Sequence, residues 1–342
     1  MLQALSVRLL SLLQLTRMAL VFTGISNSLC ALLLAARSRN PAGELLPCID
    51  WRAAATMAAI STGLYGFGMS LNDIVDRRRD LQLAAHRPLP SGRISLVAAH
   101  VVCITLGLGA LAAAAVYSRL TGDWRSMLLA AWTMLLIFFY NVAGKYLPAI
   151  GLLTLGFIRF FHALIAAPDV PLIWHPLTLF THVAVLSAVA YVWEDKRPLL
   201  TRLHAVALVV GVCAVNLLGL GLLRRRWAAG WQLMATVGEK GLLAPAVAGA
   251  AFIVVAWIIR RRSASARQAG QTAMLTGLLW LIVYDSAFAL GYLGVMYALA
   301  LLSLAPLSYG MVLAMRWWSK AMMFSQPPQY RRLREGTQAR SQ

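Results

Sequence analysis

Long apolar runs alternate with short polar segments along almost the whole chain. Runs of about twenty apolar residues are long enough to cross a hydrocarbon core of about 30 Å as a helix, and a helix satisfies its own backbone hydrogen bonds in lipid. Little more than Gly291 separates the last two runs, so they form either a tight hairpin or one long broken helix. We therefore predict an all-α polytopic bundle of nine or ten transmembrane helices. The spans, within a few residues, are 18–36, 53–71, 95–117, 126–142, 149–167, 176–194, 203–223, 241–260, 271–290 and 292–315.

Composition agrees with this pattern. The 342 residues are 60% hydrophobic and only 13% charged, whereas soluble domains carry about a quarter charged residues. We expect a single membrane domain, 1–342, with no second, soluble domain. Residues 1–17 are apolar and lack a small-x-small cleavage site, which predicts an uncleaved interfacial helix. Residues 319–342 are rich in proline and arginine and predict a disordered basic tail.

The net charge of +19 would suggest a nucleic-acid partner in a soluble protein. Here no nucleic-acid motif occurs, and Lys and Arg collect at helix ends, where they set topology and meet anionic lipid. We expect membrane lipids as partners and no nucleic acid. With the N-terminus inside, loops 72–94, 143–148, 195–202 and 261–270 hold most of the basic residues. This predicts a multi-pass protein of the cell or inner membrane with these loops on the cytoplasmic side, although Arg224–Arg226 falls outside in this scheme.

An acidic segment, Asn72–Asp80, follows directly on the second span. Asp73, Asp76 and Asp80 are spaced i, i+3, i+7, so on a helix they share one face, with Asn72 at its edge. Three carboxylates on one face repel one another unless a cation binds there. Mg²⁺ takes oxygen ligands and usually binds substrate phosphates as well. No zinc-type spacing of cysteines or histidines occurs, so Mg²⁺ is the cofactor we expect.

The alternative interpretation is a solvated helix end whose charges are offset by Arg77–Arg79. Two features favour a functional site. Ionisable groups next to an apolar span are costly and usually functional. The segment is also followed by a basic, turn-rich loop, 86–95, that contains Arg87 and Arg93 and is suited to binding an anion beside a metal.

The combined pattern N-D-x-x-D-x-x-x-D, from Asn72 to Asp80, and R-P-L-P-S-G-R, from Arg87 to Arg93, resembles the UbiA superfamily of intramembrane prenyltransferases. The diagnostic residues cover mainly 72–95, and the helix pattern is consistent over most of the chain. The resemblance implies Mg²⁺-dependent transfer of a prenyl group from a prenyl diphosphate donor to a small-molecule acceptor. It also implies that the acidic segment binds metal and that Arg87 binds diphosphate.

The resemblance further implies a second acidic motif, of D-x-x-x-D type, at the end of the sixth span. The sequence there reads Tyr191-Val-Trp-Glu194-Asp195-Lys196, and we expect Tyr191, Glu194 and Asp195 to share a helical face. The later Asp of the motif is absent. Three interpretations stay open. Glu194 and Asp195 hold a second Mg²⁺ or act as a base, Lys196 or Arg197 pairs phosphate directly at a weakened metal site, or the segment is an ordinary charged helix cap.

Further polar residues lie near these motifs. Asn141 and Lys145 belong to a segment that resembles the family's Y-(N/S)-x-x-x-K, whose Lys is expected to meet diphosphate. Both residues are therefore diphosphate candidates, and a juxtamembrane anchor is the alternative. Arg159 lies inside the fifth span and is expected to face the polar cavity of the bundle. It resembles the Arg of the family's G-x-x-R stretch, here Gly156 to Arg159, and this resemblance makes it a candidate for binding diphosphate. Asp285, in the ninth span, is either a structural partner of a Tyr or Arg or a catalytic group.

Three other functions compete with prenyl transfer. A transporter or permease would use the acids as a cation path and would show paired broken helices near the midplane. A CDP-alcohol phosphotransferase would carry a long D-G-x-x-A-R pattern, which is absent. A catalytically weakened homologue would bind a prenyl diphosphate without turnover. The sequence does not name the acceptor or the prenyl chain length.

Overall fold

The computed structural model describes residues 2–39, 50–85, 87–170, 172–228 and 240–324, and every regular element in these ranges is helical. The long helices are α2 (Val21–Arg39), α3 (Trp51–Val75), α5 (Leu96–Thr121), α6 (Arg125–Val142), α7 (Pro148–Ala166), α8 (Trp174–Trp193), α9 (Arg202–Ala228), α11 (Lys240–Arg262), α12 (Ala266–Tyr292) and α14 (Leu304–Phe324). The shorter ones are α1 (Leu2–Leu15), η1 (Met18–Leu20), α4 (Arg77–Leu83), η3 (Gly144–Tyr146) and α13 (Val295–Leu302). The predicted all-α bundle is confirmed.

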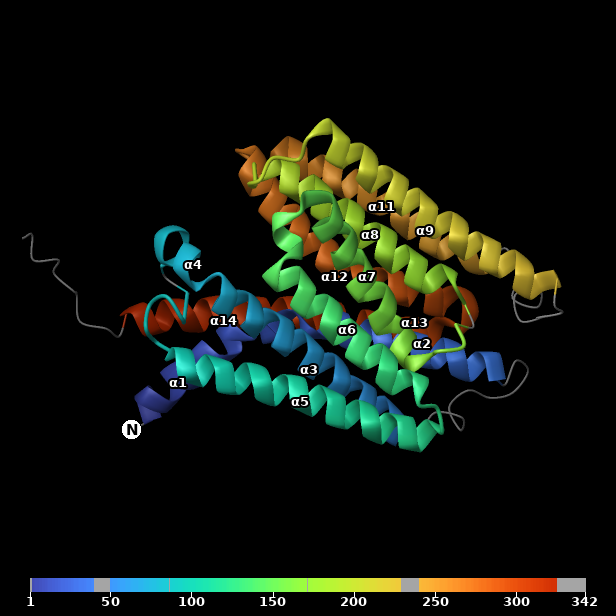
Figure 1. Ribbon diagram of the computed structural model, residues 1–342, viewed down its shortest axis with the longest axis horizontal. Helices are drawn as coiled ribbons and strands as arrows, with labels where there is room; N and C mark the ends of the chain where they lie inside the picture. The colour runs from blue at the N-terminus through green and yellow to red at the C-terminus, as the bar shows by residue number, and fades with distance from the viewer. Residues whose placement is uncertain (1, 40–49, 86, 171, 229–239, 325–342) are drawn as a thin grey trace, which may run out of the picture.

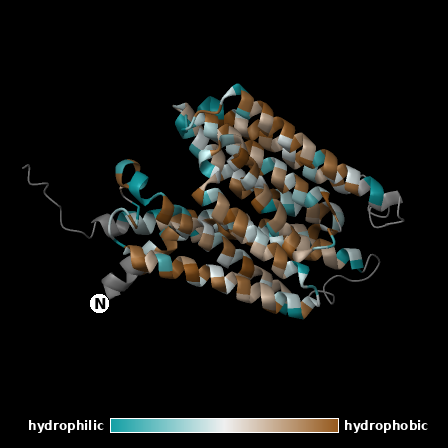
Figure 2. Ribbon diagram, in the orientation of Figure 1, coloured by the Kyte–Doolittle hydropathy of each residue, from teal (hydrophilic) through white to brown (hydrophobic). Residues whose placement is uncertain are grey.

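Among the described residues, nine helical segments are long and apolar enough to cross a membrane. Helix α3, with 25 residues, is not one of the nine, because it carries many small and polar residues. Its small and polar side chains pack against α2, α5 and α6. Figure 2 shows hydrophobic residues along the helix bodies and hydrophilic residues gathered at the ends of the bundle and in α4. The helix that carries the acidic segment is therefore an internal helix of a membrane bundle.

The long helices run side by side between two ends of the molecule (Figure 1). We call one the motif end; it holds segments 76–85, 87–95, 143–147 and 194–201. The opposite end holds the connections 122–124, 167–170 and 172–173. Both predicted acidic motifs thus lie at the same end of the bundle. The predicted inside loops lie there too, whereas Arg224 and Arg225, near the end of α9, lie toward the other end.

Two glycines, Gly63 and Gly66, bring α3 close to α5. A Cβ added at Gly63 would lie 2.8 Å from both the Leu106 carbonyl oxygen and the Ala110 Cβ, and one at Gly66 would lie 2.7 Å from the Leu106 Cδ1. At Gly63 the nearest atoms include backbone, so a side chain there would force the helices apart; small residues allow such close approach between membrane helices. This packing holds the C-terminal end of α3, with its carboxylates, in a fixed place.

The last two predicted spans form a tight hairpin. The chain turns at Leu293 and Gly294, and Gly294 has φ +109°, a conformation that favours glycine. Across the turn, the Ser286 hydroxyl donates to the Ala298 carbonyl at 2.7 Å. Helix α14 then extends to Phe324, so the first residues of the predicted disordered tail, 319–324, are helical. The remainder of that tail, 325–342, lies outside the described residues.

Candidate active site

The three motif carboxylates lie around the junction of α3 and α4. The Asp76 amide donates to the Asn72 carbonyl at 2.9 Å, and the Asp80 amide donates to the Asp76 carbonyl at 2.8 Å, so helical hydrogen bonding continues through the junction. Asp73, Asp76 and Asp80 therefore stay on one side, as their spacing predicts. Their side chains are only 3%, 13% and 9% exposed, respectively. Asn72 also hydrogen-bonds the Asp73 carboxylate.

Each carboxylate is paired with a cation from another element. Arg87 Nη1 lies 2.6 Å from Asp80 Oδ2 and 3.6 Å from Asp73 Oδ1, so one nitrogen lies between two carboxylates. Lys145 Nζ contacts Asp76 Oδ1 at 2.5 Å. The structure thus brings together Arg87, Lys145 and the acidic segment, which are the core of the predicted site. Arg77–Arg79, the cations of the alternative interpretation, are exposed, and none pairs with these carboxylates among the described residues.

A third cation, Arg17, was not predicted. Its Nη2 donates to Asp73 Oδ1 at 3.3 Å. Arg17 lies between α1 and η1 and has left-handed backbone angles, φ 47° and ψ 39°, which are uncommon outside glycine and often mark functional sites. In the sequence it is one isolated arginine at the edge of an apolar run. Its contact with Asp73, which lies far along the chain, is what indicates its role at the site.

The loop after α4 is folded back on itself. The Ser91 amide donates to the Arg87 carbonyl at 3.0 Å and the Ile94 amide donates to the Pro88 carbonyl at 3.2 Å, while Gly92 has φ +75°. Arg93 Nη1 donates to Gln14 Oε1 at 3.0 Å and so anchors the loop to α1. Partial burial lowers the pKa of the Arg93 guanidinium. The turn residues of this loop therefore position Arg87 over the acidic segment.

These residues have the chemistry to bind a divalent cation, but among the described residues the three carboxylates do not bring their oxygens within 4.8 Å of one another as a group. They lie on one side of the α3–α4 junction and are largely removed from water, which is costly without opposite charge. Their oxygens are the ligands that Mg²⁺ prefers. The surrounding arginines and lysine fit the oxygens of a diphosphate, because charge-assisted hydrogen bonds to phosphate are strong. The arrangement suits a metal ion and an anion bound together, with the charge of each compensated by the other.

Asn141 lies in the last turn of α6 and Lys145 in η3, and only Lys145 reaches the acidic segment. Asn141 is 3% exposed and its Nδ2 donates to the Ile137 carbonyl at 2.9 Å. Its Oδ1 has no hydrogen-bond partner among the described residues. Asn141 therefore keeps one buried acceptor available beside the site.

The second motif differs from the expected geometry. Helix α8 ends at Trp193, and Asp195 has φ +49°. The prediction that Tyr191, Glu194 and Asp195 share a helical face is wrong, because the chain leaves the helix before Asp195. The Asp195 side chain is 76% exposed, whereas that of Glu194 is 16% exposed and lies 3.3 Å from Lys196 Nζ. The Tyr191 hydroxyl donates to the Pro198 carbonyl at 2.5 Å.

The two motifs are close in space even though no carboxylate of one contacts the other among the described residues. The Tyr140 phenol lies within electrostatic range of both Asp76 and Tyr191. Tyr191 in turn interacts with Arg79. The two halves of the motif end therefore face a shared polar region, in which Asp73, Asp76 and Asp80 supply most of the enclosed negative charge.

Arg159 lies deeper in the bundle than the acidic segment. Its guanidinium donates to Asn27 Oδ1 at 3.2 Å and to Thr23 Oγ1 at 3.1 Å. The Asn27 amide donates to Asp285 Oδ2 at 2.7 Å, and His175 Nε2 lies 2.8 Å from Asp285 Oδ1. Asp285 thus has structural partners, although neither is the Tyr or Arg that we predicted. Arg159 is not brought into contact with the motif carboxylates.

Comparison with known proteins identifies the family. A family model described as the UbiA prenyltransferase family matches residues 25–272. A solved structure of digeranylgeranylglyceryl phosphate synthase is similar in fold, with a TM-score of 0.59 and 17% identity over 84% of this chain and 99% of the other. A UbiA homolog from Archaeoglobus fulgidus, solved with GPP and Mg²⁺, gives a TM-score of 0.45 and 13% identity over 86% of this chain and 99% of the other. No curated protein matches the sequence.

Proposed function

Because the chain belongs to the UbiA prenyltransferase family and is thus a multi-pass intramembrane prenyltransferase, we propose that it transfers a prenyl group from a prenyl diphosphate, in a Mg²⁺-dependent reaction, to a small-molecule acceptor. One observation supports the proposal most strongly. Three enclosed carboxylates on one side of α3 and α4 are surrounded by Arg17, Arg87 and Lys145. A metal ion and a diphosphate together match that pattern of charge.

Asp73, Asp76 and Asp80 would hold the Mg²⁺, with Asn72 orienting Asp73. When bound, the ion would neutralise charge on the diphosphate oxygens. Arg87 and Lys145 would exchange part of their pairing with the carboxylates for hydrogen bonds to the diphosphate, and the Asn141 amide lies at the edge of the same region. Stabilising the charge on a leaving group is the largest contribution that such preorganised donors make to catalysis.

In the reaction, the bond between the first prenyl carbon and the diphosphate oxygen breaks, and its electron pair leaves with the diphosphate. The allylic cation that remains must be protected from water, and the apolar helix bodies of the bundle provide that protection. Aromatic faces near the site favour a cation. The acceptor then gives an electron pair to the carbon and loses a proton.

The second motif supplies the remaining acidic groups of the proposal. Glu194, the more enclosed of the pair, would take the acceptor's proton or bind a second Mg²⁺ through water, with Tyr191 beside it. Asp195 is exposed and contributes to a metal only if the segment rearranges. Lys196 lies next to Glu194 and would pair with phosphate. The incomplete motif favours, as the second candidate, a homologue that binds prenyl diphosphate and turns it over slowly.

The acceptor and the membrane side are also proposals. The motif end carries most of the loop arginines and lysines, so by the positive-inside rule it would face the cytoplasm. Anionic lipids would contact these residues as partners. The acceptor would enter from the membrane or from that side.

The experiment is a turnover assay on the purified protein in lipid nanodiscs. It receives Mg²⁺, prenyl diphosphates of several lengths and a panel of acceptors, and released diphosphate and prenylated product are both measured. We expect product with at least one acceptor, and loss of product in Asp76→Ala and in the presence of a chelator. Asp123→Asn, a carboxylate at the opposite end, is the matched control. The proposal fails if no pair of substrates releases diphosphate, or if Asp76→Ala turns over like the wild type.

A further inference from the structure

A second polar site lies inside the bundle, on the side of the acidic segment that faces the membrane interior. It is formed by α7, α2 and α3 and centres on Arg159. We infer that this site binds an anionic oxygen group, a carboxylate or a phosphate, on the acceptor substrate. The inference rests on the proposed function, because it assigns the acceptor half of the same reaction.

The guanidinium of Arg159 has more donors than partners. An arginine carries five N–H donors, and among the described residues Arg159 donates only to Asn27 and Thr23, both neutral. The Arg159 side chain is only partly covered by the bundle. A cation within a membrane span that keeps donors available is suited to an oxygen ligand, because unpaired buried donors are costly.

The network behind Arg159 holds the guanidinium in place. Asn27 accepts from Arg159 through Oδ1 and donates through Nδ2 to Asp285. Asp285 is 0% exposed and also pairs with His175. The Asp285 carboxylate therefore offsets the positive charge of Arg159 through the Asn27 amide, without contacting the guanidinium. This leaves the remaining N–H groups for a ligand.

A neighbouring histidine provides an independent observation. His162, one turn after Arg159 on α7, is 5% exposed, and its Nδ1 has no hydrogen-bond partner among the described residues. Its Nε2 lies 3.1 Å from Ser61 Oγ. A Cβ added at Gly24 would lie 3.7 Å from Arg159 Nη1 and 3.8 Å from His162 Cε1. Both side chains thus border the same point on α2.

Tyr65 connects this site to the diphosphate site. Its phenol interacts electrostatically with Arg17, which pairs with Asp73, and with Arg159. On α3, Tyr65 precedes Asp73 by about two turns, or about 12 Å along the helix. An acceptor whose anionic group is held by Arg159 would therefore point its opposite end toward the diphosphate site. That orientation brings its nucleophilic atom toward the prenyl carbon that loses diphosphate.

The test measures ligand selectivity by isothermal titration calorimetry of the full chain in nanodiscs with Mg²⁺ and geranyl thiolodiphosphate, an unreactive donor analogue. The probes are benzoate and phenyl phosphate, with benzamide and phenol as neutral counterparts. Comparing the affinities of benzoate and phenyl phosphate shows whether the site prefers a carboxylate or a phosphate. We expect at least one anion to bind about tenfold tighter than its neutral counterpart. Arg159→Met should remove this preference, and Gly24→Val should block the probe sterically.

Both variants should bind the donor analogue as the wild type does, and Arg119→Met, an exposed arginine near the end of α5, should change nothing. The inference is wrong if the wild type binds neither anion more tightly than its neutral counterpart, or if Arg159→Met keeps the preference. Asp76→Ala separates the two claims: it should abolish binding of the donor analogue and leave binding of the anionic probe. If Asp76→Ala binds the analogue normally, the proposed function fails, whatever the probes show.

Discussion

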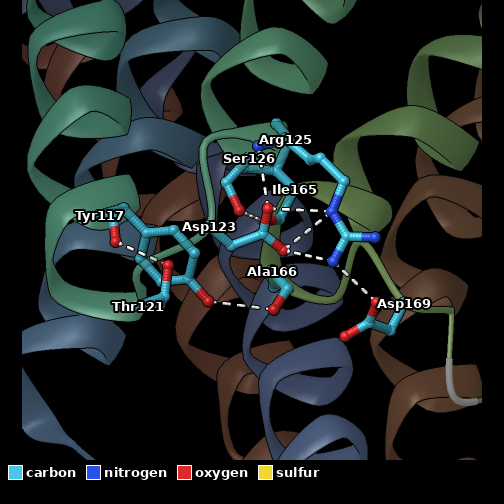
Figure 3. A network of polar contacts seen from close by, with 8 residues as sticks. All are labelled: Tyr117, Thr121, Asp123, Arg125, Ser126, Ile165, Ala166 and Asp169. Carbon is cyan, nitrogen blue, oxygen red and sulfur yellow. Dashed lines mark hydrogen bonds and ion pairs between the residues drawn. The ribbon is translucent and has the colours of Figure 1, made fainter.

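Carboxylates and arginines meet at both ends of the bundle, but in different ways. At the opposite end, Arg125 Nη2 lies 2.7 Å from Asp123 and 2.7 Å from Asp169, so one cation serves two acids (Figure 3). The Arg125 and Asp169 side chains are 48% and 68% exposed. Nearby, the Tyr117 and Ser126 hydroxyls donate to the Ala166 and Ile165 carbonyls at the end of α7. At the motif end, three enclosed acids draw cations from three separate elements.

The difference separates a structural contact from a binding site. We call the contact at the opposite end, formed by Tyr117, Asp123, Arg125, Ser126 and Asp169, the clamp. It joins the α5–α6 connection to the end of α7 through exposed ion pairs, which stabilise by less than about 1 kcal/mol each. Its hydroxyls also satisfy terminal helix carbonyls. The motif end removes like charges from water on one helix face, which costs stability. Such an arrangement is retained where a ligand compensates for the cost. The two ends should therefore respond to mutation in opposite ways.

The largest effect should come from Asp73→Ala. Asp73 is the most enclosed motif carboxylate and contacts both Arg17 and Arg87. We expect kcat/KM for prenyl transfer to fall on the order of 10²–10³-fold, because the ligands of the metal and the position of two cations are lost together. Initial rates of product formation measure it. A loss below about tenfold would show that the acidic face is not the centre of catalysis.

Lys145→Met should have a smaller effect on the same end. It removes one charged donor from the diphosphate and leaves Asp76 without its partner. We expect affinity for prenyl diphosphate to weaken about 10- to 100-fold, as for the loss of a hydrogen bond to a charged group. Titration calorimetry with a donor analogue measures the change. Unchanged affinity would mean that Lys145 serves only Asp76.

Asp123→Asn should affect stability and spare activity. It weakens the bidentate contact with Arg125, and we expect Tm to fall by less than about 4 °C with turnover within about twofold of the wild type. Thermal unfolding in nanodiscs and the turnover assay measure the two effects. A large loss of activity would remove the distinction between the two ends.

The smallest effect concerns pH at the same clamp. Hydrogen bonding from Arg125 lowers the pKa of Asp123. A carboxyl with a lowered folded-state pKa contributes stability above its unfolded pKa of about 3.9 and loses it as pH falls through the folded value. The Tm difference between wild type and Asp123→Asn should therefore be constant between pH 5 and 7 and shrink below about pH 4. A difference that grows with acidity would contradict this sign.

Local patterns predicted much of this molecule. Apolar runs predicted the helices, and the spacing of Asp73, Asp76 and Asp80 predicted their shared face, because both depend on helix periodicity alone. The partners Arg87 and Lys145 were within reach of sequence reasoning because they follow motif-bearing segments. Arg17 was not, because its role depends on how η1 packs against the end of α3. The end of α8 at Trp193 was also missed, since Glu194 and Asp195 continue a helical pattern that the backbone does not follow.

The most direct test of the account is Mg²⁺-dependent binding of geranyl diphosphate to the full chain in nanodiscs, measured by calorimetry for wild type and Asp76→Asn. Asp76→Asn keeps the side-chain size and removes one charge, while Asp123→Asn makes the same change at the clamp. The account predicts tight binding with Mg²⁺ and weak binding with a chelator for wild type and Asp123→Asn, and weak binding in both conditions for Asp76→Asn. Binding by the wild type that is independent of Mg²⁺, or Mg²⁺-dependent binding that survives in Asp76→Asn, would contradict it.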